Sequence, residues 1–297
     1  MNIKKVGLTA LAASLVSVSA HAGEMSVAGS ASIGLKNTSK TSTGKSWTMG
    51  NQLTFSGSGE LDNGMNVSLS FVIDQNDDST KTTAAQLDNA PFDSHSVTVS
   101  SDAMGSLKFS GEGGSSAQSA IDTTAAGDLW DNGSGFDTPK ASEAGNNSFV
   151  YTLPSLMDDL TLVGSYSPGG AGGPSATAFR VGFTGVEGLS VDFAEGQIET
   201  VGSEADVTTI KGSYAISSFT LSASSTEYDA ASGDETVDSY NVAYTVSDDL
   251  SIAYGTETIE TQGSATDEEA EKFNVSYTTG GVTLSATQYN FEGSGNT

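Results

Sequence analysis

Alternation of apolar and polar residues, repeated from Gly23 nearly to the end of the chain, is the feature that most constrains this sequence. In the segment NSFVYTLPSLMDDLTLVGSY, Phe149 and Tyr151 alternate with polar or smaller neighbours before a turn. Leu160 and Leu162 alternate again after it. A period of two places apolar side chains on one face of a strand and polar side chains on the other. The segment therefore predicts a hairpin whose two strands each have one apolar face.

The same unit returns along the whole chain as an alternating run, a short turn, a second run and a longer polar loop. The pattern predicts fifteen strands, joined by seven short and seven long connections in strict alternation. LDNG at residues 61–64 is one of the short turns, because an Asn-Gly pair is a strong hairpin signal. The longest connection, residues 111–146, is rich in Gly, Ser and Asp, and no convincing amphipathic helix occurs outside it. The chain is therefore predicted to be all-β.

Three features favour lipid, rather than a second sheet, as the partner of the apolar faces. Short and long connections fall at opposite ends of the strands, as in outer-membrane barrels. Charged residues fall in the opposite phase from large apolar ones, and an Arg or Lys on the lipid face costs about 2–4 kcal/mol at mid-bilayer. Tyrosines gather near the turns, as in an aromatic girdle. We predict a transmembrane antiparallel β-barrel, with a soluble sandwich as the alternative. The tyrosines are Tyr151, Tyr214, Tyr244, Tyr254 and Tyr277.

The first 22 residues have the pattern of a Sec signal peptide rather than of a folded segment. Lys4 and Lys5 precede the short apolar run VGLTALAASLVSV, and AHA at residues 20–22 is a small-x-small cleavage site. We expect cleavage near Ala22 and a β-barrel domain of residues 23–297. No later run is long and apolar enough for a transmembrane helix, so we expect a secreted, periplasmic or outer-membrane protein.

Acidic residues dominate the charge of the chain, which is −26 and becomes −28 if Lys4 and Lys5 are removed with the signal. This balance argues against nucleic acid as a partner, because phosphate contacts need Lys and Arg. It predicts a mild cation preference if the interior conducts ions. With His95 as the one histidine after residue 22 and no cysteine, no catalytic triad or metal-ligand spacing can be assigned. We expect no enzyme and no cofactor, and calcium on the acidic loop pairs 77–78 and 268–269 stays open.

The signal sequence, the opening strand GEMSVAGSASIGL and the hairpin NNSFVYTLPSLMDDLTLVGSY resemble those of the general porins of Gram-negative bacteria. The resemblance covers most of the mature chain. It implies a sixteen-stranded outer-membrane barrel, usually a homotrimer in lipid, that passes ions and small hydrophilic solutes by passive diffusion. It also implies that the third long connection, residues 111–146, folds into the lumen and narrows it. A secreted or surface-exposed β-protein without channel activity, such as an adhesin, is the alternative.

Two departures from the resembled family concern the constriction and the last strand. The family places a basic cluster opposite the acidic loop, whereas this chain has no cluster of arginines. The chain stops at NFEGSGNT, so we expect the sixteenth strand to be missing from the sequence. The polar strand faces and, by the resemblance, the third long connection supply the pore-lining candidates. These are Lys36, Asp74, Lys108, Glu112, Asp122, Asp128, Asp131, Asp137, Arg180, Asp192 and Lys211.

Overall fold

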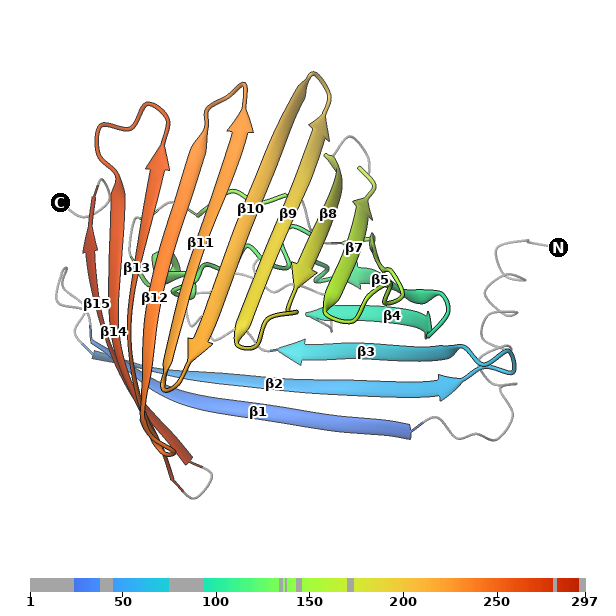
Figure 1. The fold of residues 1–297 in the computed structure, drawn as a ribbon, viewed down its shortest axis with the longest axis horizontal. Coiled ribbons are helices and arrows are strands. Elements are labelled where there is room, and N and C mark those ends of the chain that lie inside the picture. The colour runs from blue at the N-terminus through green and yellow to red at the C-terminus, as the bar shows by residue number, and fades with distance from the viewer. Residues whose placement is uncertain are drawn as a thin grey trace. The chain divides into compact units, whose positions relative to one another are not determined.

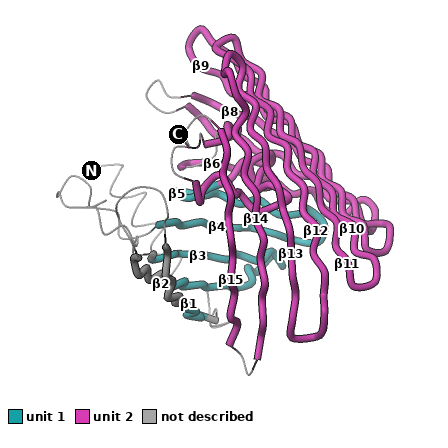
Figure 2. Tube along the Cα trace, turned by 90° about the vertical axis from the view of Figure 1, so that its left-hand side faces the viewer, with its two compact units in different colours: residues 1–114 teal, residues 115–297 magenta. Residues whose placement is uncertain are grey.

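A computed structural model of the protein describes residues 24–37, 45–74, 93–133, 136, 138–142, 146–169, 174–279 and 282–293. These residues form fifteen β-strands and one short 3-10 helix, so the predicted all-β antiparallel fold is confirmed. None of the described helical residues forms a helix with the length and hydropathy needed to cross a membrane. The predicted signal peptide, residues 1–22, lies outside the described residues. The chain divides into two compact units, residues 1–114 and 115–297 (Figure 2).

The first unit is an antiparallel meander of five strands, in which each strand pairs with the next one along the chain (Figure 1). The predicted LDNG turn joins its second and third strands. Gly64 there has φ 81°, a left-handed conformation that suits glycine, and the Asn63 side chain accepts a hydrogen bond from the Met65 N–H at 3.1 Å. The strands are β1 (Glu24–Asn37), β2 (Lys45–Glu60), β3 (Asn66–Asp74), β4 (Ser94–Ser101) and β5 (Gly105–Glu112).

The second unit contains ten strands, and each again pairs with its neighbour in the chain. The 3-10 helix η1 (Leu129–Asn132) precedes them in sequence. The strands are β6 (Ser148–Thr152), β7 (Leu160–Ser167), β8 (Ser175–Phe183), β9 (Leu189–Thr200), β10 (Ser203–Ile216), β11 (Phe219–Ala230), β12 (Glu235–Ser247), β13 (Leu250–Thr261), β14 (Glu268–Thr279) and β15 (Val282–Glu292).

The sheet of the second unit has two chemically different faces. On β10, Ile210 and Ile216 point to the outer face and are 52% and 51% exposed, whereas Val207 and Thr209 point to the inner face and are fully buried. The outer face exposes large apolar side chains on strand after strand, which suits contact with hydrocarbon. Four of the predicted girdle tyrosines are exposed there, and Tyr244 packs on Phe219 of the next strand with ring centroids 4.6 Å apart. The four are Tyr151, Tyr214, Tyr254 and Tyr277.

The predicted alternation of short and long connections is wrong in the second unit. Only residues 201–202 join β9 to β10, and residues 231–234 join β11 to β12, where long loops were expected. The strands extend into the residues predicted as long loops, because exposed and buried side chains still alternate there, with polar residues on the outer face. Glu204 and Asp206 are exposed while Ala205 is buried, so the extension lacks the large apolar residues on which the prediction relied.

Candidate functional site

Residues 115–133, 136 and 138–142, here called the inner segment, run along the inner face of the second unit. The segment belongs to the predicted third long connection, and hydroxyl groups from neighbouring strands bind its main chain. Ser224 of β11 accepts a hydrogen bond from the Ala125 N–H, and Ser239 of β12 accepts one from the Ala126 N–H, both at 2.8 Å. The wall therefore binds the backbone of the segment, whatever side chains the segment carries.

Glu257 of β13 is the most extensively buried acidic anchor of the inner segment, with 2% of its surface exposed. Its two carboxylate oxygens accept the N–H groups of Leu129 and Trp130 at 3.3 and 3.2 Å. These amides open the helix η1, and N–H groups at a helix start need an external acceptor. Leu129 is fully buried and packs with Ala126 and Ala270 in the apolar cluster beneath the segment. One charged contact and one apolar contact thus fix the same turn.

A buried amide holds the two arms of the inner segment together. The Gln118 side chain is fully buried, donates to the Thr209 hydroxyl of β10 and accepts the N–H of Ser142, both at 2.8 Å. The Ser142 hydroxyl also lies within hydrogen-bond distance of the Ser116 hydroxyl. Because buried polar groups are stable only when bonded, these contacts fix how the segment enters and leaves the inner face.

Basic side chains are few in the second unit, and each is engaged. Residues 115–297 contain four of them, Lys140, Arg180, Lys211 and Lys272. The ammonium groups of Lys211 and Lys272 donate to main-chain carbonyls of the inner segment, at Thr123 and Ala126. Arg180 pairs with Asp192 of the next strand at 2.8 Å, and Lys140 pairs with Glu235 at 3.6 Å. The lysines thus act as tethers of the segment rather than as a free basic wall.

Asp122 and Asp128 line a hollow of about 70 Å³ at the inner segment. Burial, and after it the Asp128 charge, raise the pKa of Asp122 to about 6, although backbone hydrogen bonds and the Lys211 charge act in the opposite direction. Asp128 is itself held by Thr124, whose N–H donates to the Asp128 carboxylate at 2.9 Å, and the Asp128 N–H donates back to the Thr124 hydroxyl at 2.7 Å. The segment therefore presents an acidic carboxyl that titrates near neutral pH beside a second one that is fixed in place.

The structure brings together only part of the predicted pore-lining set. Asp122, Asp128 and Lys211 lie at the inner segment, and Arg180 and Asp192 pair on the inner face nearby along β8 and β9. Asp131 is exposed in η1. In the first unit Lys108 is exposed on β5, while Glu112 lies 3.9 Å from His95. Lys36 lies in β1 and Asp74 ends β3, and Asp137 is outside the described residues.

Four charged residues of the site were missed by the sequence prediction, namely Lys140, Glu235, Glu257 and Lys272. A signal for three of them existed, because Glu257 and Lys272 fall in the polar phase of their strands and Glu235 begins one. Their partners could not be found, since each contact joins the inner segment to a strand about a hundred or more residues away along the chain.

One of the two acidic pairs considered for calcium lies in a strand. Glu268 and Glu269 do not lie in a loop as predicted but begin β14, where Glu268 is buried and Glu269 exposed, on opposite faces. Residues 77–78 lie outside the described residues. Within the described part of the chain, no three His, Asp or Glu side chains are grouped closely enough to hold a metal ion.

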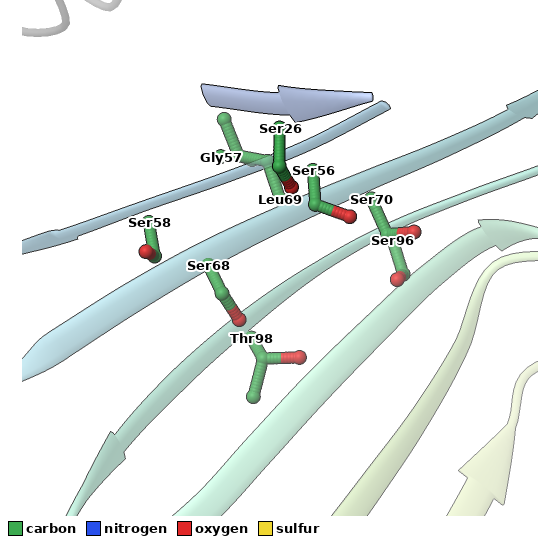
Figure 3. Close-up of a pocket in the computed structure, with 9 residues that line it drawn as sticks. All are labelled: Ser26, Ser56, Gly57, Ser58, Ser68, Leu69, Ser70, Ser96 and Thr98. Atoms are coloured by element: carbon green, nitrogen blue, oxygen red, sulfur yellow. The ribbon is translucent and has the colours of Figure 1, made fainter. Parts of the chain in front are cut away.

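One face of the first unit carries a hollow lined mainly by hydroxyl groups (Figure 3). The strand register pairs Ser26 with Ser56, Ser56 with Ser70, and Ser70 with Ser96, so one serine from each of β1–β4 stands in a row. The hollow measures about 450 Å³ and has no charged lining residue. A hydroxyl both donates and accepts hydrogen bonds, so the row is a neutral surface suited to water and polar solutes.

The fold and the site together define a class of protein: an antiparallel sheet of membrane-barrel type, apolar outside, with a long connection anchored to its polar inner face. The sequence profile of Gram-negative porins matches residues 7–297. The chain therefore belongs to the Gram-negative porin family. No curated protein sequence matches it.

Solved structures share the fold at low sequence identity. A loop L8 deletion mutant of OmpT, an outer-membrane protein of Vibrio cholerae, is 15% identical, with a TM-score of 0.67 over 91% of this chain and 94% of that one. A porin structure refined at 1.8 Å is 14% identical, with a TM-score of 0.67 over 92% of this chain and 96% of that one. An anion-selective porin from Comamonas acidovorans is 16% identical, with a TM-score of 0.59 over 90% and 88%. At such identities the likeness establishes the fold.

Proposed function

We propose that the protein is an outer-membrane channel through which ions and small hydrophilic solutes diffuse passively. The observation that carries the proposal is the inner segment, because main-chain anchors from β11, β12 and β13 hold it on a polar face. A solvent-excluding core would have no use for such a polar face, whereas a water-filled lumen requires one. Membership of the porin family supports the same function. Proteins of this family and fold are generally channels without enzymatic activity.

We further propose a mild cation preference, which rests on the charges that remain free on the inner face. The four basic residues of the second unit are paired with acids or with segment carbonyls. Hydrogen bonds to carbonyls leave the charges of Lys211 and Lys272 in place, which is why the expected preference is mild, while Asp122 and Asp128 share one hollow and concentrate cations there. A related fold occurs in an anion-selective porin, so the fold does not decide selectivity and the side chains must.

Planar bilayer recording tests both parts of the proposal. Stepwise current increases on insertion are expected from a channel, and their absence at every voltage would contradict channel function. In a KCl gradient, the reversal potential is expected to shift from zero towards the equilibrium potential of potassium. A shift towards the equilibrium potential of chloride would refute the cation preference without contradicting channel function.

Export, cleavage and assembly complete the proposal. The Sec-type pattern of residues 1–22 supports cleavage near Ala22, and the resemblance to general porins supports a homotrimer. Mass measurement of the N-terminus of the exported protein, together with light scattering of the detergent-solubilised protein, tests both. An intact N-terminus would contradict cleavage, and a monomeric mass would contradict the trimer.

A further inference from the structure

Lys140 is the one basic residue of the inner segment, and three contacts hold it. Its ammonium lies 3.6 Å from one oxygen of Glu235, and its backbone N–H donates to the other oxygen at 2.7 Å. The same ammonium lies 4.9 Å from the ring centroid of Tyr228, within the range of a cation–π contact. The charge and the main chain of residue 140 are therefore both bound to one place on the wall.

The partners of Lys140 are built into the sheet. Glu235 begins β12 and is 4% exposed, and the strand register places Tyr228 of β11 directly opposite it. A buried carboxylate needs a compensating charge, and both of its oxygens are occupied by Lys140. A flexible lysine would otherwise sample many rotamers around residue 140, so Glu235 and Tyr228 select one of them.

The position of Lys140 matters because Lys140 lines the same hollow as Asp122 and Asp128. The charged groups that act on the Asp122 carboxyl are Asp128, which raises its pKa, and Lys211, which lowers it. Among the ion pairs of the described residues, the Lys140 ammonium pairs with Glu235 rather than with Asp122 or Asp128, although Lys140 lines the same hollow. The Lys140 charge is therefore bound to Glu235 rather than to either aspartate.

We propose that Glu235 is a positioning residue that sets the ion preference of the constriction, because it holds the Lys140 ammonium away from Asp122 and Asp128. The inference rests on the proposed channel function and adds the residue that determines its charge selectivity. Without the Glu235 charge, the lysine side chain turns towards the two aspartates, where opposite charges attract it. The hollow then loses net negative charge although no residue facing it has been replaced.

The test uses the substitution Glu235→Gln, which preserves shape and leaves an amide oxygen to accept the Lys140 N–H. In the wild type, the cation preference measured from reversal potentials is expected to fall as the pH drops through about 6, where Asp122 gains its proton. An opposite charge within reach lowers the pKa of an aspartate by about one to three units. In Glu235→Gln the midpoint is therefore expected to move to lower pH by about one to three pH units, and the preference at pH 7 to decrease.

Two further variants separate release of Lys140 from the loss of one carboxylate. The double variant Glu235→Gln/Lys140→Gln has no ammonium to release, so its midpoint is expected to return to about 6. Glu260→Gln removes the same charge from an exposed residue on the outer face of β13 and is expected to leave midpoint and preference unchanged. Circular dichroism checks that each variant keeps its β-structure.

A midpoint that stays near 6 in Glu235→Gln, or one that stays low in the double variant, overturns the inference while the conductance steps uphold the channel. Infrared titration of the carboxyl band in detergent, with Asp122→Asn as the reference, follows the same proton without any current. A shifted infrared midpoint with an unshifted reversal potential likewise overturns the role of Glu235 in selectivity. If neither the wild type nor any variant conducts, the proposed function itself is refuted, and with it the selectivity role.

Discussion

Removal of the Glu257 carboxylate is expected to loosen the inner segment at the helix η1. The carboxylate accepts two N–H groups, from Leu129 and Trp130, and it is almost fully buried. A hydrogen bond to a charged acceptor contributes about 1.5–3 kcal/mol, so the variant Glu257→Ala loses about 3–6 kcal/mol from the contact. The upper part of this range is a limit, because water that enters the vacated space can bind the freed amides.

Hydrogen exchange followed by mass spectrometry measures this loss directly in the detergent-solubilised protein. Each 1.4 kcal/mol is a factor of ten in an equilibrium constant, so a loss of about 3 kcal/mol speeds exchange in a peptide spanning residues 124–133 about 100-fold. The matched control Glu195→Ala changes an exposed glutamate of β9 and is expected to leave this peptide unchanged. Unaltered exchange in Glu257→Ala would refute the view that this carboxylate anchors the segment.

Three further predictions address the packing, the charge and the hydroxyl lining. A Cβ on Gly255 would lie 2.8 Å from the Ala126 Cβ, so Gly255→Ala is expected to cost about 1–3 kcal/mol in denaturant unfolding, whereas Gly164→Ala, with open space around it, is not. Asp122→Asn is expected to abolish the change in reversal potential near pH 6, because the carboxyl that loses its charge there is gone; a retained change would assign it to another group. Replacing Ser56, Ser70 and Ser96 together by Ala is expected to slow liposome swelling in neutral sugars and to leave ion preference intact, and equal slowing for all solutes would contradict a hydroxyl contribution.

Strand identity could be predicted from the sequence because the period of two is a local property. Each predicted strand required only that large apolar residues such as Phe179 and Val181 recur at every second position. Strand ends could not be predicted equally well, because the prediction followed large apolar residues alone. Beyond Ile210 the outer face of β10 turns polar at Thr208 and Asp206, and the strand continues because its inner face is covered.

The candidate site was predictable only as a region. The length and acidity of residues 111–146 indicated a special connection, and Asp122 and Asp128 were identified within it. The strand residues that bind the inner segment were not identified, since their role depends on which carbonyl or N–H group of the segment lies opposite them. Lys211 illustrates the limit, because its phase predicts the polar face of the strand but not the bond of its ammonium to the Thr123 carbonyl.

The most direct test of the whole account asks which face of the strands meets lipid. The chain has no cysteine, so single cysteines at Phe183, Val242 and Ser222 can each carry a spin label in reconstituted bilayers. The labels at 183 and 242 lie on the outer face and are expected to collide more often with oxygen, which concentrates in lipid, than with a water-soluble nickel chelate. The label at 222 lies on the inner face and is expected to collide more often with the nickel chelate. Outer-face labels shielded from both relaxation agents, as in a sheet packed against another sheet, would contradict the account.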